Sequence, residues 1–351
     1  MPCIARVDWA DDSARLIKAA DTMPLDAWLP EGFIPAHDAN VRWALVTHPV
    51  FKRAEAKMPL SNGLVVTWVV DLVPDGSTLR MHVRMANTSA EPRKIPWFPI
   101  WAASWAMPGR NDRIRWWKSL SFEGAETDLA AKPKASLFSH VHSSDVLDGG
   151  VNPYWRVAGK NGCAYFSLDW CGGWRADLEG ARKGLVFRAR LPEDETQLTL
   201  NPGEALEGPI LNVTFTREAD EALSRAAWTR QRAALAQRLY GGPAPSFPFA
   251  WNHWYAARFD IDGNFLRRQA DVLAPYGFDY FIVDAGWYEA CGKWNPDPKK
   301  FKPGEFEQIL RAVKDKGPKI GLWTCPQFVQ ADPKALPPEV DVTWMRVALY
   351  G

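Results

Sequence analysis

Over most of the first two hundred residues, hydrophobic and polar positions alternate with a period of two, the period of a β-strand. In the segment 78–85 the hydrophobic residues are Leu79, Met81, Val83 and Met85, and the residues between them are Arg80, His82 and Arg84. Segments 64–70, 185–191 and 211–216 also have strand character, and turn signals such as Asn201-Pro202-Gly203 separate them. We therefore predict a β-sandwich over residues 1–216, in which segment 78–85 is a half-buried strand.

The pattern changes at Arg217 to a stretch rich in alanine, arginine, glutamate and glutamine. Its hydrophobic residues recur at helical spacing: Leu223, Ala227, Ala234, Leu235 and Leu239. Gly241-Gly242-Pro243 then ends the helix. We predict a linker helix within residues 217–245 and a domain boundary near residue 245.

From residue 246 to residue 351, strand-like runs alternate with helix-like stripes. Runs at 249–254, 280–283 and 319–324 predict strands. One helix is predicted between Asp262 and Pro275, and a second around the stripe Phe306, Ile309, Leu310 and Val313. This βαβαβ order predicts a parallel sheet with right-handed crossovers. In barrels and open sheets alike, the carboxyl ends of such strands carry the chemistry.

Charge and composition exclude several classes of partner. The 42 basic and 41 acidic residues include no long like-charge block, so no nucleic-acid partner is indicated. No run reaches the roughly 18 apolar residues of a membrane span, and the N-terminus lacks a signal-peptide pattern, so we expect a cytoplasmic protein without a membrane partner. The five cysteines and the pair His140 and His142 form no metal-ligand pattern, and we predict neither a metal nor a cofactor.

The predicted strand ends carry residues suited to sugar binding. Asp284 follows the second strand, and a carboxylate accepts hydrogen bonds from neighbouring sugar hydroxyls. Trp254, Trp287 and Trp294 lie nearby in a chain with 19 tryptophans, and an aromatic ring can cover the apolar face of a sugar. The alternative interpretation is that Asp284 caps a turn and the tryptophans fill the core.

Residues 248–330 resemble the start of the barrel in glycoside hydrolase family 36, the α-galactosidases and raffinose synthases. Three motifs carry the resemblance, in the family's order and spacing. They are Asn252-His253-Trp254-Tyr255-Ala256-Ala257-Arg258-Phe259-Asp260, Asp284-Ala285-Gly286-Trp287, and Gly292-Lys293-Trp294 followed by Asn295-Pro296-Asp297-Pro298-Lys299-Lys300-Phe301. The resemblance implies an α/β fold of the (β/α)8 TIM-barrel type after the β-sandwich, of which about the first three strands are present.

The resemblance also implies which residues bind the substrate, and some positions of this sequence depart from the family pattern. Trp254 and Trp294 would line the galactose pocket, Asp284 would hold the sugar hydroxyls, and Trp287 and Cys325 would complete the set. Ala285, Cys325 and Gln327 differ from the family pattern, which leaves the exact sugar open. In the first domain, Trp174 is a candidate for a loop that walls the substrate site.

Family members are retaining hydrolases that use two carboxylates. The residues from Ser246 onward are too few for a barrel of about 250 residues, so we expect the nucleophile and the acid/base beyond Gly351 and no activity from this chain by itself. The expected function is that of an α-galactosidase-like glycosidase acting on an oligosaccharide or glycoside. A raffinose-synthase-type transglycosidase and a noncatalytic carbohydrate-binding protein are alternatives, and a homo-oligomer of the full-length protein is left open.

Overall fold

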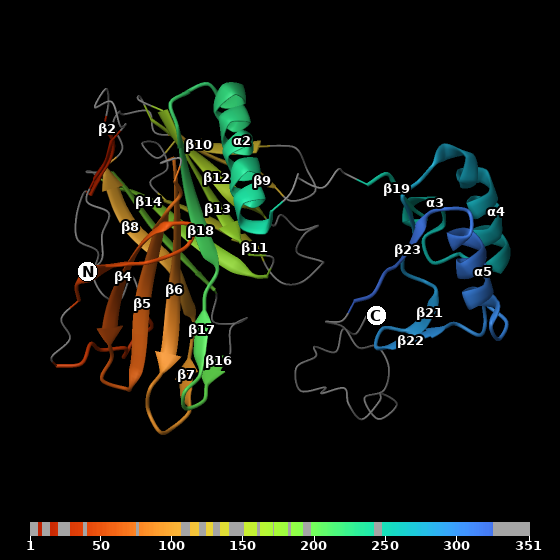
Figure 1. The fold of residues 1–351 in the computed structure, drawn as a ribbon, viewed down its shortest axis with the longest axis horizontal. Helices are drawn as coiled ribbons and strands as arrows, with labels where there is room; N and C mark the ends of the chain where they lie inside the picture. The colour runs from red at the N-terminus through yellow and green to blue at the C-terminus, as the bar shows by residue number, and fades with distance from the viewer. Residues whose placement is uncertain are drawn as a thin grey trace. The chain divides into compact units, whose positions relative to one another are not determined.

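The computed structural model describes residues 6–8, 15–19, 29–37, 41–74, 77–106, 113–118, 124–128, 134–139, 151–159, 162–170, 172–181, 184–191, 198–241 and 248–325. The chain divides into two compact units, Met1–Ala244 and Pro245–Gly351 (Figure 1). The division falls beside residue 245, where the stretch predicted as a linker helix ends and the alternation of strand-like and helix-like segments begins.

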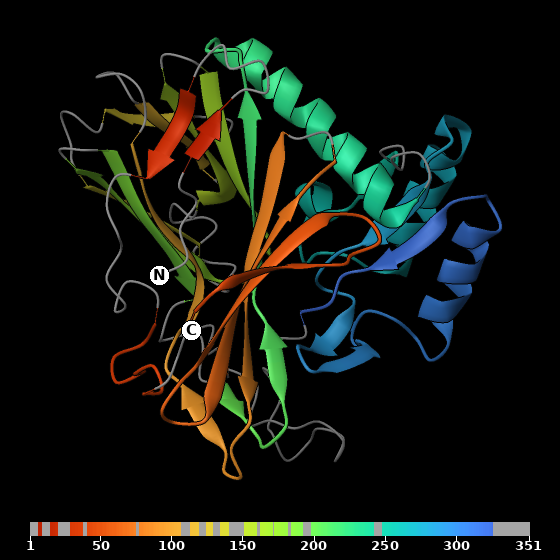
Figure 2. The ribbon, with the colours of Figure 1, turned by 60° about the vertical axis from the view of Figure 1, so that its left-hand side comes forward.

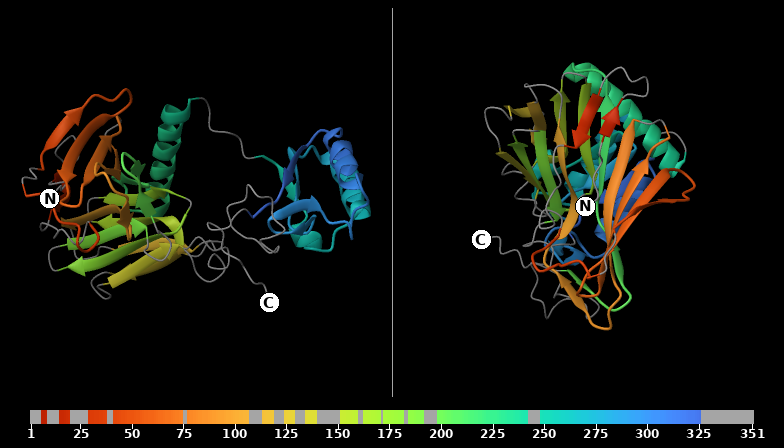
Figure 3. Two further views of the ribbon diagram at one scale, coloured as in Figure 1. Left: turned by 90° about the horizontal axis from the view of Figure 1, so that it is seen from below. Right: turned by 90° about the vertical axis from the view of Figure 1, so that its left-hand side faces the viewer.

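The first unit contains two large antiparallel sheets. One has the order β1 (Arg6–Asp8), β2 (Arg15–Ala19), β8 (Phe98–Ala106), β15 (Gly184–Leu191), β14 (Trp174–Ala181) and β11 (Lys134–Ser139). The other has the order β10 (Gly124–Asp128), β9 (Arg113–Lys118), β12 (Val151–Gly159), β13 (Gly162–Asp169), β18 (Ile210–Thr216), β6 (Thr78–Asn87), β5 (Leu64–Leu72), β4 (Lys52–Pro59) and β3 (Trp43–Val46), with β17 (Ala205–Glu207) also paired to β6. A short pair, β7 (Arg93–Ile95) and β16 (Leu198–Leu200), completes the described strands of the unit (Figure 3).

One hydrophobic core lies between the two large sheets. Buried residues of β5, β6, β12, β13 and β18 from the ten-stranded sheet pack with buried residues of β8, β14 and β15 from the other sheet. At its centre the ring of Trp155 stacks on Phe166 at 5.1 Å and on Trp174 at 6.0 Å between ring centroids. Trp174 is 1% exposed, so its predicted role in a substrate-walling loop is wrong. A ring buried between two sheets has no face left for a ligand.

Helix α2 (Glu221–Tyr240) covers part of the outer face of the ten-stranded sheet (Figure 2). It begins at Asp220, whose carboxylate accepts a hydrogen bond from the backbone N–H of Leu223 at 2.9 Å. Its buried residues are Ser224, Ala227 and Leu235. Leu223 is 61% exposed and Ala234 is exposed as well, so the hydrophobic face predicted from the sequence is wrong at these two positions. None of the helices in the described parts of the chain has the length and apolar character needed to cross a membrane.

Polar contacts attach this helix to the sheet. The hydroxyls of Tyr165 and Ser224 lie 3.0 Å apart, and the indole of Trp228 stacks on Tyr165 at 5.0 Å. Arg232 pairs with Asp169 at 2.8 Å, and Asp169 also lies 3.6 Å from Arg80. Polar contacts therefore attach the helix to the sheet in addition to the burial of its hydrophobic residues.

The prediction that strand 78–85 has an exposed polar face is wrong in part. On that face Arg80 is only 6% exposed, and His82 is buried as well. The Arg80 guanidinium lies over the ring of Phe51 at 5.3 Å, and burial lowers its pKa. The period-two pattern indicates which residues share a face, but it does not show that neighbouring side chains such as Phe51 cover the polar face too.

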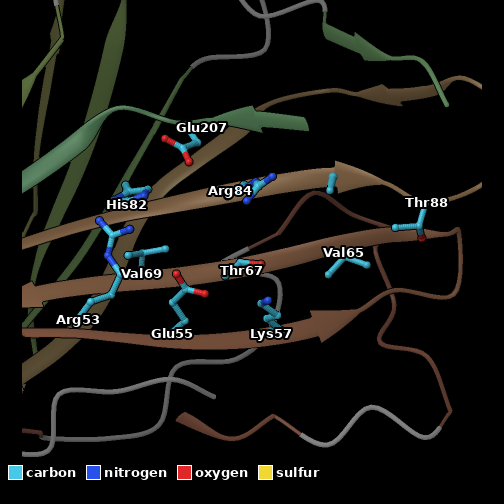
Figure 4. Close-up of a pocket in the computed structure, with 11 residues that line it drawn as sticks. Arg53, Glu55, Lys57, Val65, Thr67, Val69, His82, Arg84, Thr88 and Glu207 are labelled. Carbon is cyan, nitrogen blue, oxygen red and sulfur yellow. The ribbon is translucent and has the colours of Figure 1, made fainter. Parts of the chain in front are cut away.

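A pocket of about 270 Å³ lies on this outer face, among β4, β5, β6 and β17 (Figure 4). Thr67, Val69 and His82 are its buried members. The charged side chains that line it carry both signs: Arg53, Glu55, Lys57, Arg84 and Glu207. Because acidic and basic groups are mixed there, the pocket favours no single class of ionic ligand.

Substitution of Gly162, the first residue of β13, tests how closely the backbone is packed at this point of the sheet. The φ of Gly162 is 135°, and a Cβ added there would lie 2.2 Å from the carbonyl oxygen of Thr216. We expect Gly162→Ala to lower the free energy of unfolding by about 2–3 kcal/mol, because both the backbone and Thr216 must shift. Urea denaturation followed by circular dichroism measures the loss.

Gly203→Ala is the matched control for that variant. Gly203 also has a positive φ, 80°, but a Cβ there would meet nothing within 4 Å. Only backbone strain remains, and we expect a loss of about 1 kcal/mol. Equal losses in the two variants would show that the contact with Thr216 costs nothing.

The second unit has three parallel strands, in the order β19 (Ala250–Asn252), β20 (Tyr280–Val283) and β23 (Lys319–Leu322). Helices α3 (Trp254–Ala257) and α4 (Gly263–Leu273) and the 3-10 turn η2 (Ala274–Tyr276) connect the first two strands. The hairpin β21 (Tyr288–Ala290) and β22 (Lys293–Pro296) and then α5 (Glu305–Lys314) connect the second to the third. The predicted βαβαβ order is present, but the predicted strand at 249–254 is shorter because Trp254 begins a helix.

Candidate functional site

The carboxyl ends of three neighbouring parallel strands form one edge of the sheet in the second unit. Asn252 ends β19, Asp284 directly follows β20, and Trp323 directly follows β23. The pairing register keeps these ends level, since Asn252 lies opposite Ile282 and Val283 lies opposite Leu322. Residues distant in sequence therefore meet at this edge, as the parallel arrangement predicts.

The carboxylate of Asp284 is held on both oxygens. Oδ2 accepts a hydrogen bond from the side-chain amide of Asn252 at 2.7 Å, and Oδ1 accepts one from the backbone N–H of Ala285 at 2.7 Å. Asn252 is itself oriented, because its Oδ1 accepts from the backbone N–H of Trp254 at 2.8 Å. A carboxylate has about four acceptor positions, so two remain for a ligand on this half-buried side chain.

His253, the residue directly after Asn252, is fully buried and contacts the backbone of Asp284. The backbone N–H of Asp284 donates to its Nδ1 at 2.9 Å, and its Nε2 lies 2.9 Å from the carbonyl oxygen of Arg258. Only a ring with its proton on Nε2 satisfies both contacts, since a carbonyl oxygen can only accept. Burial lowers the pKa of His253, which favours this neutral form.

Aromatic rings gather beside the strand ends. Trp254 and Trp294 are half-buried, and each packs against the hydrophobic core of the unit. The ring of Trp294 lies edge-on to Tyr288 at 4.8 Å and to Trp323 at 6.5 Å. Half-buried rings of this kind have apolar surface left to cover a ligand.

Trp287 and Cys325, the two remaining predicted site residues, differ in how deeply they are buried. Trp287 is only 5% exposed, its ring stacks on Phe306 at 5.4 Å, and its indole N–H donates to the carbonyl oxygen of Trp323 at 3.0 Å. This burial suits a core residue, so we leave Trp287 out of the ligand-contacting set. Cys325 is half-buried and lies three residues beyond the end of β23.

The buried phenol of Tyr288 adds a neutral group to this region. Burial is the largest cause that raises its pKa, and its hydroxyl lies 3.5 Å from the sulfur of Cys291. The hydroxyl therefore stays protonated at neutral pH.

Within the residues that the structure describes, no group of three His, Cys, Asp or Glu side chains could hold a metal ion. Cys163, Cys291 and Cys325 are present there as thiols. His140, His142 and Gln327 lie outside the described residues.

Sequence reasoning quoted Asn252, His253 and Lys300 only as parts of motifs and gave them no role. The structure places all three in contact with the loops around Asp284. One signal was available for Asn252, because the ends of neighbouring parallel strands meet. The contacts of His253 and Lys300 depend on how the loops fold, and the sequence pattern does not show that.

Comparisons with known proteins agree with this arrangement. Residues 205–343 match the Melibiase family model. Alpha-galactosidase C of Emericella nidulans is 23% identical over 245 residues, which are 64% of this chain and 31% of that protein. Alpha-galactosidase 1 of Pediococcus pentosaceus is 25% identical over 142 residues, 38% of this chain and 19% of that protein. The matched residues therefore cover at most about a third of the length of these two relatives.

Solved structures show a shared sheet-rich fold. The GH36 alpha-galactosidase AgaA from Geobacillus stearothermophilus matches with a TM-score of 0.63 and 18% identity, over 86% of this chain and 45% of that one. The alpha-galactosidase from Lactobacillus brevis matches with a TM-score of 0.62 and 18% identity, over 82% of this chain and 41% of that one. Together the family model, the relatives and the solved structures confirm that this chain resembles the α-galactosidases of glycoside hydrolase family 36.

Proposed function

We propose that this chain is the sugar-binding part of an α-galactosidase-like, retaining glycoside hydrolase. In this proposal, residues 1–216 form a β-sandwich domain, residues 217–245 form a linker helix, and residues 246–351 form the start of a (β/α)8 barrel. The observation that carries the proposal is the Asp284 carboxylate, held on both oxygens at the carboxyl end of a parallel strand. The names of the matched relatives support it.

The chemistry of the site suits a sugar with adjacent hydroxyls. The two acceptor positions left on Asp284 can take hydrogen bonds from two hydroxyl groups, and charge-assisted bonds of this kind contribute about 1.5–3 kcal/mol each. Trp254 and Trp294 supply aromatic surface for the apolar face of the ring. Cys325, beyond the neighbouring strand end, is the further residue proposed to contact the ligand.

The proposed ligand class is an oligosaccharide or glycoside that contains galactose. Variants of AgaA have been solved in complex with raffinose and with stachyose, and their structures match this chain with TM-scores of 0.62 and 0.64. These complexes support an oligosaccharide substrate.

We further propose that residues 1–351 bind the sugar without hydrolysing it. The described ends of β19, β20 and β23 present one carboxylate, Asp284. A retaining mechanism needs two, about 5–5.5 Å apart, one as nucleophile and one as acid and base. Release of nitrophenol from a nitrophenyl α-galactoside by the purified chain, above a blank, would contradict this proposal.

Titration of the isotope-labelled chain with galactose tests the sugar-binding role. We expect galactose to shift the NMR signals of the Asp284 and Ala285 amides and of the Trp254 and Trp294 indoles. Glucose, which differs at one hydroxyl, is the control and should shift them less. Unchanged signals at saturating galactose would exclude this site.

A further inference from the structure

The segment 295–301 belongs to the third motif of the sequence and supplies no proposed ligand contact. Its last two residues have different surroundings. Phe301 is buried in the core of the second unit, which anchors the segment. The side chain of Lys300 reaches two backbone carbonyls, with Nζ 2.6 Å from the oxygen of Phe259 and 2.8 Å from the oxygen of Gly286.

These two carbonyls belong to the two loops that carry the candidate sugar-binding residues. Phe259 lies in the loop after β19, a few residues beyond Trp254, and Gly286 lies two residues beyond Asp284. The loops are in direct contact here, because a Cβ added to Gly286 would lie 3.0 Å from the Cα of Phe259. Lys300 therefore bridges the loops where they touch, and an ammonium group can donate to both carbonyls at once.

His253 connects the same two loops at a second point. It accepts a hydrogen bond from the backbone N–H of Asp284 and donates one to the carbonyl oxygen of Arg258, at 2.9 Å each. The backbone amide of Asp284 is therefore held by a hydrogen bond to His253. Two residues further on, the same turn is tied through the carbonyl of Gly286 by Lys300.

We propose that Lys300 and His253 are positioning residues that lock the turn at Asp284–Gly286 onto the loop after β19 and so fix the direction of the Asp284 carboxylate. Neither residue contacts the ligand in this proposal. Its consequence for sugar affinity rests on the proposed function above. The hydrogen bonds that fix the turn do not depend on the proposed function, and their effect can be measured in the protein without ligand.

Lys300→Met is the main test, because methionine keeps the length of the side chain and removes the ammonium group. The reporters are the amides of Asp284 and Ala285, which are both hydrogen-bonded. We expect their hydrogen exchange to become at least tenfold faster, while amides of α5 and β6 exchange as in the unmodified chain. Galactose affinity should fall about three- to tenfold.

Lys299→Met is the matched control, since Lys299 is the exposed neighbour in the same segment. We expect it to leave the exchange of Asp284 and Ala285 unchanged. The proposal is overturned if Lys300→Met behaves like Lys299→Met. It is also overturned if exchange rises equally throughout the second unit, because that result would show a general loss of stability.

His253 can be tested in the unmodified chain, which avoids any variant that fails to fold. The ¹⁵N shifts of its ring should show a proton on Nε2 and none on Nδ1 at pH 7. Burial lowers its pKa, and Lys300 also lowers it, while the Arg258 carbonyl, Asp284 and the backbone at Ala285 act in the opposite direction. Protection of the Asp284 amide should therefore persist below pH 6.5 and be lost only in more acid solution.

Two substitutions at His253 separate its two hydrogen bonds. The side-chain oxygen of asparagine can stand near the position of Nδ1, whereas glutamine reaches the position of Nε2. We expect slow exchange of the Asp284 amide in His253→Asn and at least tenfold faster exchange in His253→Gln. A ring protonated on both nitrogens at pH 7, or equal exchange in the two variants, would overturn the role of His253.

The experiments distinguish a failure of the positioning role of Lys300 and His253 from a failure of the proposed function. If the unmodified chain does not bind galactose, the proposed function is wrong and amide exchange still decides whether the lock exists. If galactose binds and the Asp284 and Ala285 amides of Lys300→Met exchange as in the unmodified chain, the positioning role of Lys300 is wrong and the proposed function stands.

Discussion

Asp284→Asn is expected to weaken galactose binding by about 10- to 100-fold, which corresponds to about 1.4–2.7 kcal/mol. Asparagine removes the charge and replaces one acceptor oxygen with a donor. That donor must face either the side-chain amide of Asn252 or the backbone N–H of Ala285, and both are donors. Asn252 cannot turn its oxygen towards it without losing the bond from Trp254. NMR titration measures the affinity, and in a catalytically active protein kcat/KM should fall about 100-fold.

Asp279→Asn is the matched control at the other end of the same strand. Asp279 precedes β20, and its carboxylate accepts a hydrogen bond from the backbone N–H of Phe249 at 2.7 Å. Asparagine can still accept that bond, so binding should stay within about twofold of the unmodified chain, or about 0.4 kcal/mol. If Asp284→Asn bound galactose as tightly as Asp279→Asn, Asp284 would be a turn residue and not a ligand contact.

Trp155→Ala should cost the largest amount of stability, about 3–5 kcal/mol. The ring is fully buried, stacked on Phe166 and Trp174, and close to the centre of the core between the two sheets. Removing it leaves a cavity that both sheets must collapse around. Urea denaturation followed by circular dichroism measures the loss. Trp155→Phe, which fills most of the space, should cost about 1–3 kcal/mol if the alanine variant does not fold.

Trp43→Ala is the control for that substitution. Trp43 lies in β3, the last strand of the ten-stranded sheet, and is partly exposed. We expect a cost below about 1 kcal/mol. A similar cost for Trp43→Ala and Trp155→Ala would show that the stacked rings between the sheets add little to stability.

The strand and helix order of the second unit could be predicted because its signals are local. The helical stripe of Phe306, Ile309 and Val313 has all three residues buried in α5, and 280–283 is the strand that the hydrophobic run predicts. The position of Asp284 at a strand end follows from the same local pattern. Its meeting with Asn252 follows from parallel pairing.

The surroundings of individual side chains could not be predicted in the same way. Trp174 and Trp287 are buried, whereas Trp254 and Trp294 are half-buried, although all four are tryptophans near predicted turns or strand ends. The difference depends on contacts between residues far apart in the chain, such as the stacking of Trp287 on Phe306. The burial of Arg80 on the polar face of β6 has the same origin, because its guanidinium lies over the ring of Phe51.

The bond between Lys300 and the carbonyl of Phe259 has a consequence for engineering sugar specificity. That bond uses only the main chain of residue 259, so it does not depend on which side chain stands there. Phe259 as a residue is 58% exposed, and its ring lies edge-on to Trp254 at 5.0 Å between ring centroids. A library of substitutions at position 259 can therefore reshape the surface beside Trp254 while the backbone that supports Asp284 keeps its attachment. This residue is a suitable starting point for changing the ligand preference that we propose for the site.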